Sequence, residues 1–232
     1  MTTELKVKQK EARKAGWLYL LLAITGGFGI MYVPSSILVM GDAEATVSNI
    51  QNYSVEFNLS IISNLISQVT FIFLVLMLSR LFKGINQKHN KLMVSLVIAS
   101  VPITFLNLLN LVGAQILASG TDYLSVFETN QLNALSVFFI DLYKNGIVIV
   151  EIFWGLWLFP FGYLVFKSGF IPKILGIFLM IGCFSYLAES LIGILNPNLK
   201  EIISPFLMIP LAVCEIAIVF WLIIKGIKTP NQ

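Results

Sequence analysis

Residues 205–224 read Pro-Phe-Leu-Met-Ile-Pro-Leu-Ala-Val-Cys-Glu-Ile-Ala-Ile-Val-Phe-Trp-Leu-Ile-Ile, an almost wholly apolar run. Glu215 is its single ionisable residue apart from the thiol of Cys214. A helix of this length extends about 30 Å, which matches the thickness of the hydrocarbon core of a bilayer. The stretch is therefore predicted to cross a membrane as a helix.

Further stretches along the chain have the same apolar character: roughly 15–39, 57–82, 92–117, 146–166 and 172–195. The 232 residues are 57% hydrophobic and 12% charged, and this composition excludes a soluble globular domain. We predict an all-α polytopic membrane protein, a bundle of six transmembrane helices. The expected division is a basic cytoplasmic N-terminal segment, a single six-helix membrane domain and a short cytoplasmic tail: 1–14, 15–226 and 227–232.

Positive charge falls on one side of this topology. Thirteen of the fifteen lysine and arginine residues lie in the N-terminal segment, the second and fourth connections and the tail. The other two, Lys144 and Lys200, fall on the opposite side, where acidic residues are more frequent. Because lysine and arginine next to spans stay on the cytoplasmic side, both termini are expected to be cytoplasmic.

Several kinds of site are excluded by residue counts. The single histidine, His89, lies in a hydrophilic connection and cannot supply a multi-histidine metal centre or bis-histidine haem ligation. Cys183 and Cys214 lie in apolar runs and form neither a CxxC pair nor a disulfide framework. Zinc-helix, phosphate-loop and nucleophile-elbow motifs are missing, so we expect no cofactor, no metal, no catalytic residue and no nucleic-acid partner.

Three glutamates lie inside predicted spans: Glu151, Glu189 and Glu215. An ionisable group in hydrocarbon costs a few kcal/mol even on lenient insertion scales, so each is a functional candidate. Polar residues at similar depth complete a predicted mid-membrane pocket for a small polar ligand or cation, with these candidates: Gln68, Asn64, Asn107 and Tyr186. The alternative is that hydrogen-bonded glutamates only hold helices together.

Lys144 has two interpretations. It pairs with Asp141 at i,i+3 spacing, which favours an interfacial ion pair at the end of the apolar run. Alternatively, Lys144 neutralises Glu151 or an anionic ligand in the predicted pocket.

Proline and glycine predict the local shape of the spans. Prolines inside four spans favour kinks: Pro34, Pro102, Pro160 and Pro210. Glycines favour close contacts between helices: Gly26, Gly27, Gly29, Gly176 and Gly182. The mixture of aromatic and acidic residues over 123–143 favours an interfacial helix leading into the fourth span.

The run from Ile152 to Gly176, IFWGLWLFPFGYLVFKSGFIPKILG, resembles the signature of a bacterial membrane family catalogued as domain of unknown function 4386. The opening Lys14-Ala-Gly-Trp-Leu-Tyr and the closing Trp221-Leu-Ile-Ile-Lys-Gly are similar to the ends of that family. The turn over 167–173 is the most specific part of the resemblance. It combines a glycine that ends one helix, a proline that begins the next and a lysine on each side. The resemblance implies a multi-pass protein of the bacterial cytoplasmic membrane and brings no established activity.

Two functions follow as hypotheses. The first is a non-enzymatic membrane protein that binds, and by extension transports, a small polar ligand or ion. The second is a structural or regulatory subunit without a ligand, which associates with a membrane-protein partner or a second copy of itself through small-residue faces. An intramembrane enzyme acting on lipid lacks the expected motifs.

Overall fold

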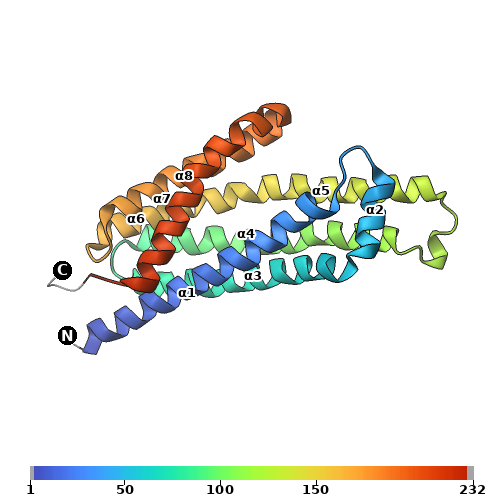
Figure 1. The fold of residues 1–232 in the computed structure, drawn as a ribbon. Helices are drawn as coiled ribbons and strands as arrows, with labels where there is room; N and C mark the ends of the chain where they lie inside the picture. Colours follow the sequence, from blue (N-terminus) through green and yellow to red (C-terminus); the bar gives the residue numbers. More distant parts are fainter. Residues whose placement is uncertain (1–2, 229–232) are drawn as a thin grey trace. The chain divides into compact units, whose positions relative to one another are not determined.

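The computed structural model describes residues 3–228, and over them it contains helices and no strand. The elements appear in this order (Figure 1): α1 Thr3–Tyr32, η1 Val33–Ile37, α2 Ala43–Asn52, α3 Ser54–Leu81, α4 Gln87–Ala118, η2 Asp122–Leu124, α5 Thr129–Leu156, α6 Leu158–Ser168, α7 Lys173–Leu195 and α8 Pro197–Ile224. Six stretches among the described residues are long and apolar enough to span a membrane: Leu5–Ile37, Ser54–Leu81, Gln87–Ala118, Thr129–Ser168, Lys173–Leu195 and Pro197–Ile224. The predicted all-α fold with six membrane helices is confirmed.

The helices extend beyond the predicted spans. Because α1 begins at Thr3, the basic N-terminal segment is the first part of a membrane helix. Helix α5 begins at Thr129 and runs unbroken into the fourth span, and the short 3₁₀ turn η2 precedes it. Most of the stretch 123–143 is therefore helical and leads into that span, as predicted, and its interfacial location stays a prediction. Of the predicted tail, residues 229–232 lie outside the described residues.

The connection between the first two spans contains a helix that the sequence analysis missed. Asp42 caps α2, and its side chain accepts a hydrogen bond from the backbone N–H of Ala45 at 2.9 Å. Such a cap satisfies one of the free N–H groups at a helix start. Aspartate favours both turns and helix starts, and here Asp42 starts a helix.

The prolines act in different ways. The fourth span is interrupted at Trp157, between α5 and α6, and Pro160 follows in the first turn of α6. Because proline has no N–H, the carbonyl of Leu156 four residues earlier loses its helical partner. Pro34 lies in the π-helical turn η1, whereas Pro102 and Pro210 stay inside the assigned helices α4 and α8.

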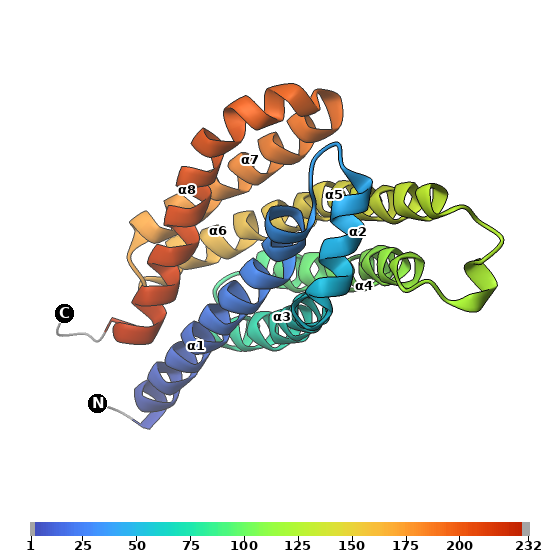
Figure 2. The same ribbon diagram turned by 45° about the vertical axis from the view of Figure 1, so that its right-hand side comes forward.

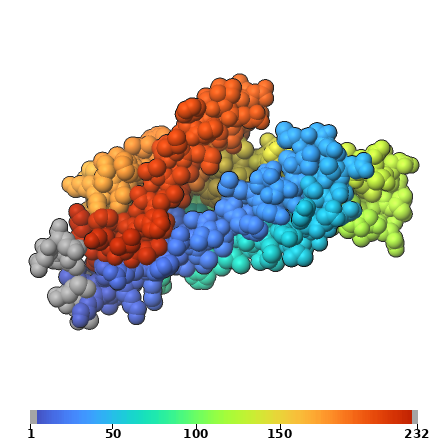
Figure 3. Space-filling model, viewed as in Figure 1, coloured from blue at the N-terminus to red at the C-terminus, as the bar shows by residue number. Residues whose placement is uncertain are grey.

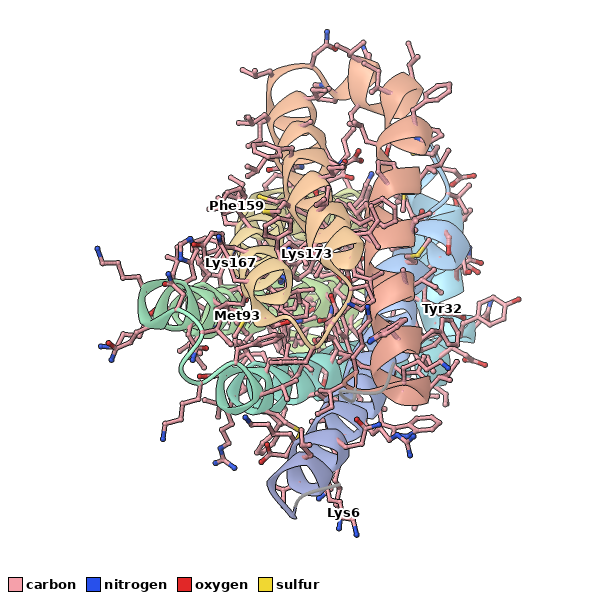
Figure 4. The ribbon with its side chains drawn as sticks, turned by 90° about the vertical axis from the view of Figure 1, so that its left-hand side faces the viewer. Lys6, Tyr32, Met93, Phe159, Lys167 and Lys173 are labelled. Atoms are coloured by element: carbon pink, nitrogen blue, oxygen red, sulfur yellow. The ribbon has the colours of Figure 1, made fainter. Side chains whose placement is uncertain are left out.

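The turn between α6 and α7 has the predicted form. Gly169 ends α6 in the left-handed conformation at φ 74°, which favours glycine, and Pro172 precedes the first residue of α7. Figure 4 shows Lys167 and Lys173 beside this turn. Their ammonium groups lie 6.0 and 5.5 Å from the ring centre of Phe166.

The chain divides into two compact units. The first comprises the described residues up to 21, together with 69–101 and those from 148 onward, and it contains α6, α7 and α8 whole. The second comprises 22–68 and 102–147. Helices α1, α3, α4 and α5 each contribute one part to each unit.

Within the first unit, the two ends of the described chain lie together. The Gln9 side chain donates to the carbonyl of Lys225 at 2.7 Å and accepts from the N–H of Ile227 at 2.9 Å. The N–H of Lys228 donates to the carbonyl of Phe170 in the α6–α7 turn at 2.7 Å. We call this end, where the start of α1 and the end of α8 meet (Figure 3), the terminal end. Its cytoplasmic orientation stays a prediction from the charges.

Small residues allow close helix contacts inside each unit. In the first unit, a Cβ on Gly16 of α1 would lie 2.7 Å from the backbone nitrogen of Ile223 in α8. In the second unit, a Cβ on Gly29 would lie 2.7 Å from the backbone nitrogen of Asn64. Close contacts also exist at three other predicted glycines: Gly26, Gly176 and Gly182. A Cβ on Gly27 would have no neighbouring atom within 4 Å, so Gly27 does not make the predicted close helix contact within the chain.

Gly16→Ala is expected to lower the free energy of unfolding by about 1–3 kcal/mol, because its Cβ overlaps the α8 backbone. Gly27→Ala is the matched control on the same helix, and it should be neutral or stabilising by up to about 1 kcal/mol. Denaturant unfolding in detergent measures both. Equal stability of the two variants would contradict the close contact between α1 and α8.

Candidate functional site

Helices α7 and α8 form a hairpin that brings polar side chains together inside the first unit (Figure 2). Asn196 starts α8: its side chain accepts from the N–H of Leu199 at 3.1 Å, and Pro197 follows at the first helical position. This start places Lys200 in the first turn of α8. Gly193 of α7 leaves room for the lysine, because a Cβ there would lie 2.9 Å from the lysine Cδ.

Lys200 lies between two glutamates from different helices. Its Nζ is 3.6 Å from Oε2 of Glu151 in α5 and 3.5 Å from Oε1 of Glu189 in α7. Ser204, one turn further along α8, donates a hydrogen bond to the same Oε1 of Glu189. We call Glu151, Glu189, Lys200 and Ser204 the charged cluster. Pairing of this kind lowers the cost of holding charges away from water.

The charged cluster has more carboxylate oxygens than partners for them. Glu189 is only 6% exposed, and its Oε2 has no hydrogen-bond partner among the described residues. Oε2 of Glu151 is likewise buried and has no hydrogen-bond partner among the described residues besides its ion pair with Lys200. Ser190 donates to the carbonyl of Val148 at 2.6 Å and so fixes α7 against α5 beside these groups. The arrangement can accept a further positive charge or hydrogen-bond donor.

A second polar group lies deeper along the same helices. Tyr186 donates a hydrogen bond to Oε1 of Glu215 at 3.0 Å. The buried hydroxyl of Tyr19 in α1 lies near the same carboxyl group but has no hydrogen-bond partner among the described residues. We call Glu215, Tyr186 and Tyr19 the Glu215 cluster. Tyr186 lies nine residues before the end of α7, which is about 14 Å along the helix axis. The mid-membrane position of this cluster stays a prediction.

The two clusters follow one face of α7. Tyr186 and Glu189 are three residues apart, so their side chains are neighbours on the helix surface. Polar groups therefore continue along α7 from the residues beside the α7–α8 turn to Tyr186. Chains of acids at membrane depth are typical of ion and proton pathways.

The predicted amides lie in the second unit and form a hydrogen-bond network there. Asn64 donates to the hydroxyl of Tyr143 at 3.2 Å, and that hydroxyl donates to the carbonyl of Gly29 at 3.3 Å. Asn107 donates to the backbone carbonyl of Tyr143 at 2.9 Å. Gln68 is buried as well, and its Oε1 has no hydrogen-bond partner among the described residues. Asn64 and Asn107 thus connect helices of their own unit.

The eight predicted site residues therefore fall into separate groups. Glu151, Glu189, Glu215 and Tyr186 lie in the first unit, and Asn64, Gln68, Asn107 and Lys144 in the second. Lys144 pairs with Asp141 at 3.5 Å on an exposed surface, as the interfacial interpretation predicts. The structure corrects the other interpretation, because the lysine beside Glu151 is Lys200.

Sequence reasoning missed Lys200, Ser204 and Tyr19. The sequence analysis counted Lys200 only among the charges opposite the basic side, although Asn196-Pro197 is a typical helix start three to four residues before it. That signal places Lys200 on a helix, but the pairing with Glu151 depends on how α7 and α8 fold back on α5. The spacing of residues along the chain does not predict that Lys200 pairs with Glu151.

Tyr186→Phe is expected to lower the free energy of unfolding by about 1–3 kcal/mol, because the buried Glu215 carboxyl loses its donor. Tyr123→Phe is the control, since Tyr123 is 68% exposed and should change nothing measurable. Unfolding in detergent at one pH compares the two. If Tyr186→Phe is as stable as the wild type, the hydrogen bond to Glu215 does not contribute to the fold.

Comparisons with known proteins give a family and one partial relative. The sequence model of the family described as "Domain of unknown function (DUF4386)" matches residues 14–226. A protein of Archaeoglobus fulgidus, described as an uncharacterized protein, is 35% identical over 77 residues. That alignment covers 33% of this chain and 44% of the relative. No solved structure matches significantly.

Proposed function

This chain belongs to the DUF4386 family of unknown function, and for it we propose a binding role without catalysis: the charged cluster binds a small cation. Its apolar helices are those of a multi-pass membrane protein. The observation that carries the proposal is the buried Oε2 of Glu189, which has no hydrogen-bond partner beside a lysine shared by two carboxylates. A buried acceptor left unpaired is costly, so a ligand that pairs with it gains the corresponding free energy.

The charge balance favours a monovalent cation. When Glu151 and Glu189 are both ionised, Lys200 neutralises one of the two negative charges. One monovalent cation balances the remaining charge, whereas a divalent cation leaves the cluster with an excess positive charge. Carboxylate and hydroxyl oxygens, here from the glutamates and Ser204, are the donors that hard metal cations prefer. A small protonated amine has the same charge and is the other member of this ligand class.

Transport of the cation is the extension of this proposal. Glu215 and its two tyrosines provide the next polar position toward the terminal end, about one helical turn beyond Glu189 on the α7 face. A cation released from the charged cluster would find there a carboxylate that accepts a hydrogen bond from the Tyr186 hydroxyl. Binding at the charged cluster does not require this second step.

A structural role is the second candidate, and one observation favours it. The charged cluster joins α5, α7 and α8 through two ion pairs and a hydrogen bond, as a helix-packing group does. In the associated hypothesis, small-residue faces bind a partner subunit. Gly16, Gly29 and Gly176 are occupied by contacts within the chain, which leaves fewer small residues for a partner.

Cation binding is tested by thermal unfolding in detergent, with Na⁺ or K⁺ replacing choline at constant ionic strength. Wild-type protein should be stabilised in a saturable way, because a ligand of the folded state adds about 2.7 kcal/mol at one hundred times its Kd. Glu189→Gln should lose this response. Glu201→Gln, which alters an exposed acid beside Lys200, should keep it.

Two results would overturn the proposal. One is a wild-type protein whose unfolding is the same in choline, Na⁺ and K⁺ and also with methylammonium as the amine probe. The other is an equal response in wild type and Glu189→Gln. In either case the charged cluster is a packing group, and the structural role is preferred.

A further inference from the structure

A groove of about 350 Å³ lies between α1 and α3 in the first unit. Its lining consists of four apolar residues and one lysine: Lys14, Trp17, Leu18, Leu21 and Met77. Its volume is within the range of about 300–1,000 Å³ that is typical of sites for small ligands. None of the intramembrane glutamates lines it, so it is independent of the charged cluster.

The lining of the groove follows α1 inward from the start of the first apolar stretch. Lys14 lies where the first apolar stretch begins, and Trp17 is 59% exposed one turn further on. Tryptophan at a span end is typical of the headgroup level. Leu21 lies seven residues beyond Lys14, which is about 10 Å along a helix. The lining thus changes from cationic to apolar with depth, as the parts of a lipid do.

A second cation lies one helical turn beyond the groove lining on α3. Arg80 follows Met77 by three residues, so the two share a helix face, and Arg80 is exposed in the last turn of α3. Arg13, the neighbour of Lys14, instead donates to the carbonyl of Ile224 at 3.3 Å and so faces α8. Lys14 in the lining and Arg80 one turn beyond Met77 are therefore the cations that the proposal uses.

We propose that this groove binds one anionic phospholipid. The phosphate lies at Lys14 and Arg80, and one acyl chain lies along Trp17, Leu18, Leu21 and Met77. Charge complementarity selects the occupant: an apolar channel below two cations matches an amphiphile with an anionic head, and each such cation attracts anionic lipid.

Another groove in the same unit provides an internal comparison. It lies between α7 and α8, has about 240 Å³, and is lined by apolar residues alone: Phe178, Ile181, Ile209, Pro210 and Val213. With no charge beside it in the lining, an acyl chain there is held without preference for a headgroup. The selectivity proposed for the α1–α3 groove comes from Lys14 and Arg80.

The test measures binding of phosphatidylglycerol and phosphatidylcholine with identical chains to the purified protein by native mass spectrometry. The wild type should bind phosphatidylglycerol more tightly, and Lys14→Gln and Arg80→Gln should each weaken that binding about fivefold without changing phosphatidylcholine binding. Trp17→Ala should weaken both lipids. Glycerophosphate, which has the headgroup without acyl chains, should not bind measurably.

The control removes two charges at the same end of the unit. Lys167→Gln with Lys173→Gln alters the lysines that lie on Phe166, and phosphatidylglycerol binding should stay within twofold of the wild type. Unchanged unfolding of every variant in lipid-free detergent establishes that each is folded. An equal loss in the control and in the Lys14–Arg80 double variant, or no headgroup preference in the wild type, would overturn the proposal.

Discussion

The ion pairs of Lys200 with Glu151 and Glu189 are the interaction on which the first unit depends. A lysine and two carboxylates inside membrane-spanning helices are tolerable only when they lie together, because each alone costs several kcal/mol. Their pairing therefore fixes α8 against both α5 and α7. Ser190, which bonds to the α5 backbone, and Ser204, which bonds to Glu189, hold the same three helices in one register.

The two units bury different kinds of polar side chain. In the second unit, Asn64, Asn107 and Tyr143 are neutral and bond to one another or to backbone carbonyls, which connects helices at little electrostatic cost. In the first unit the polar groups of the two clusters are ionisable, and the charged cluster contains two ion pairs. This difference is the reason for assigning binding to the glutamates and packing to the amides.

Much of the fold could be predicted from the sequence because hydropathy and local signals act over short distances. The six membrane helices, the Gly169 to Pro172 turn and the burial of Glu189 are examples. The partner of Glu151 could not be predicted in this way. Lys144 lies on the same helix as Glu151 and was therefore considered as its partner. Lys200 belongs to α8 and comes close to Glu151 only because the α7–α8 hairpin folds back on α5. Local signals also fit the continuation of α5 through 129–143 into the fourth span, since no helix breaker occurs there.

A double-mutant cycle on Lys200 and Glu189 tests the central claim most directly, with the free energy of unfolding in detergent as the measurement. Lys200→Met alone should cost about 3–5 kcal/mol, since it leaves two carboxylates without their cation. Glu189→Gln in the same chain should recover about 1 kcal/mol or more of that loss. Lys144→Met, which breaks the exposed pair with Asp141, should cost at most about 1 kcal/mol. Additive effects of the two substitutions in the cycle would contradict the account, because they would show that Lys200 and Glu189 do not stabilise each other.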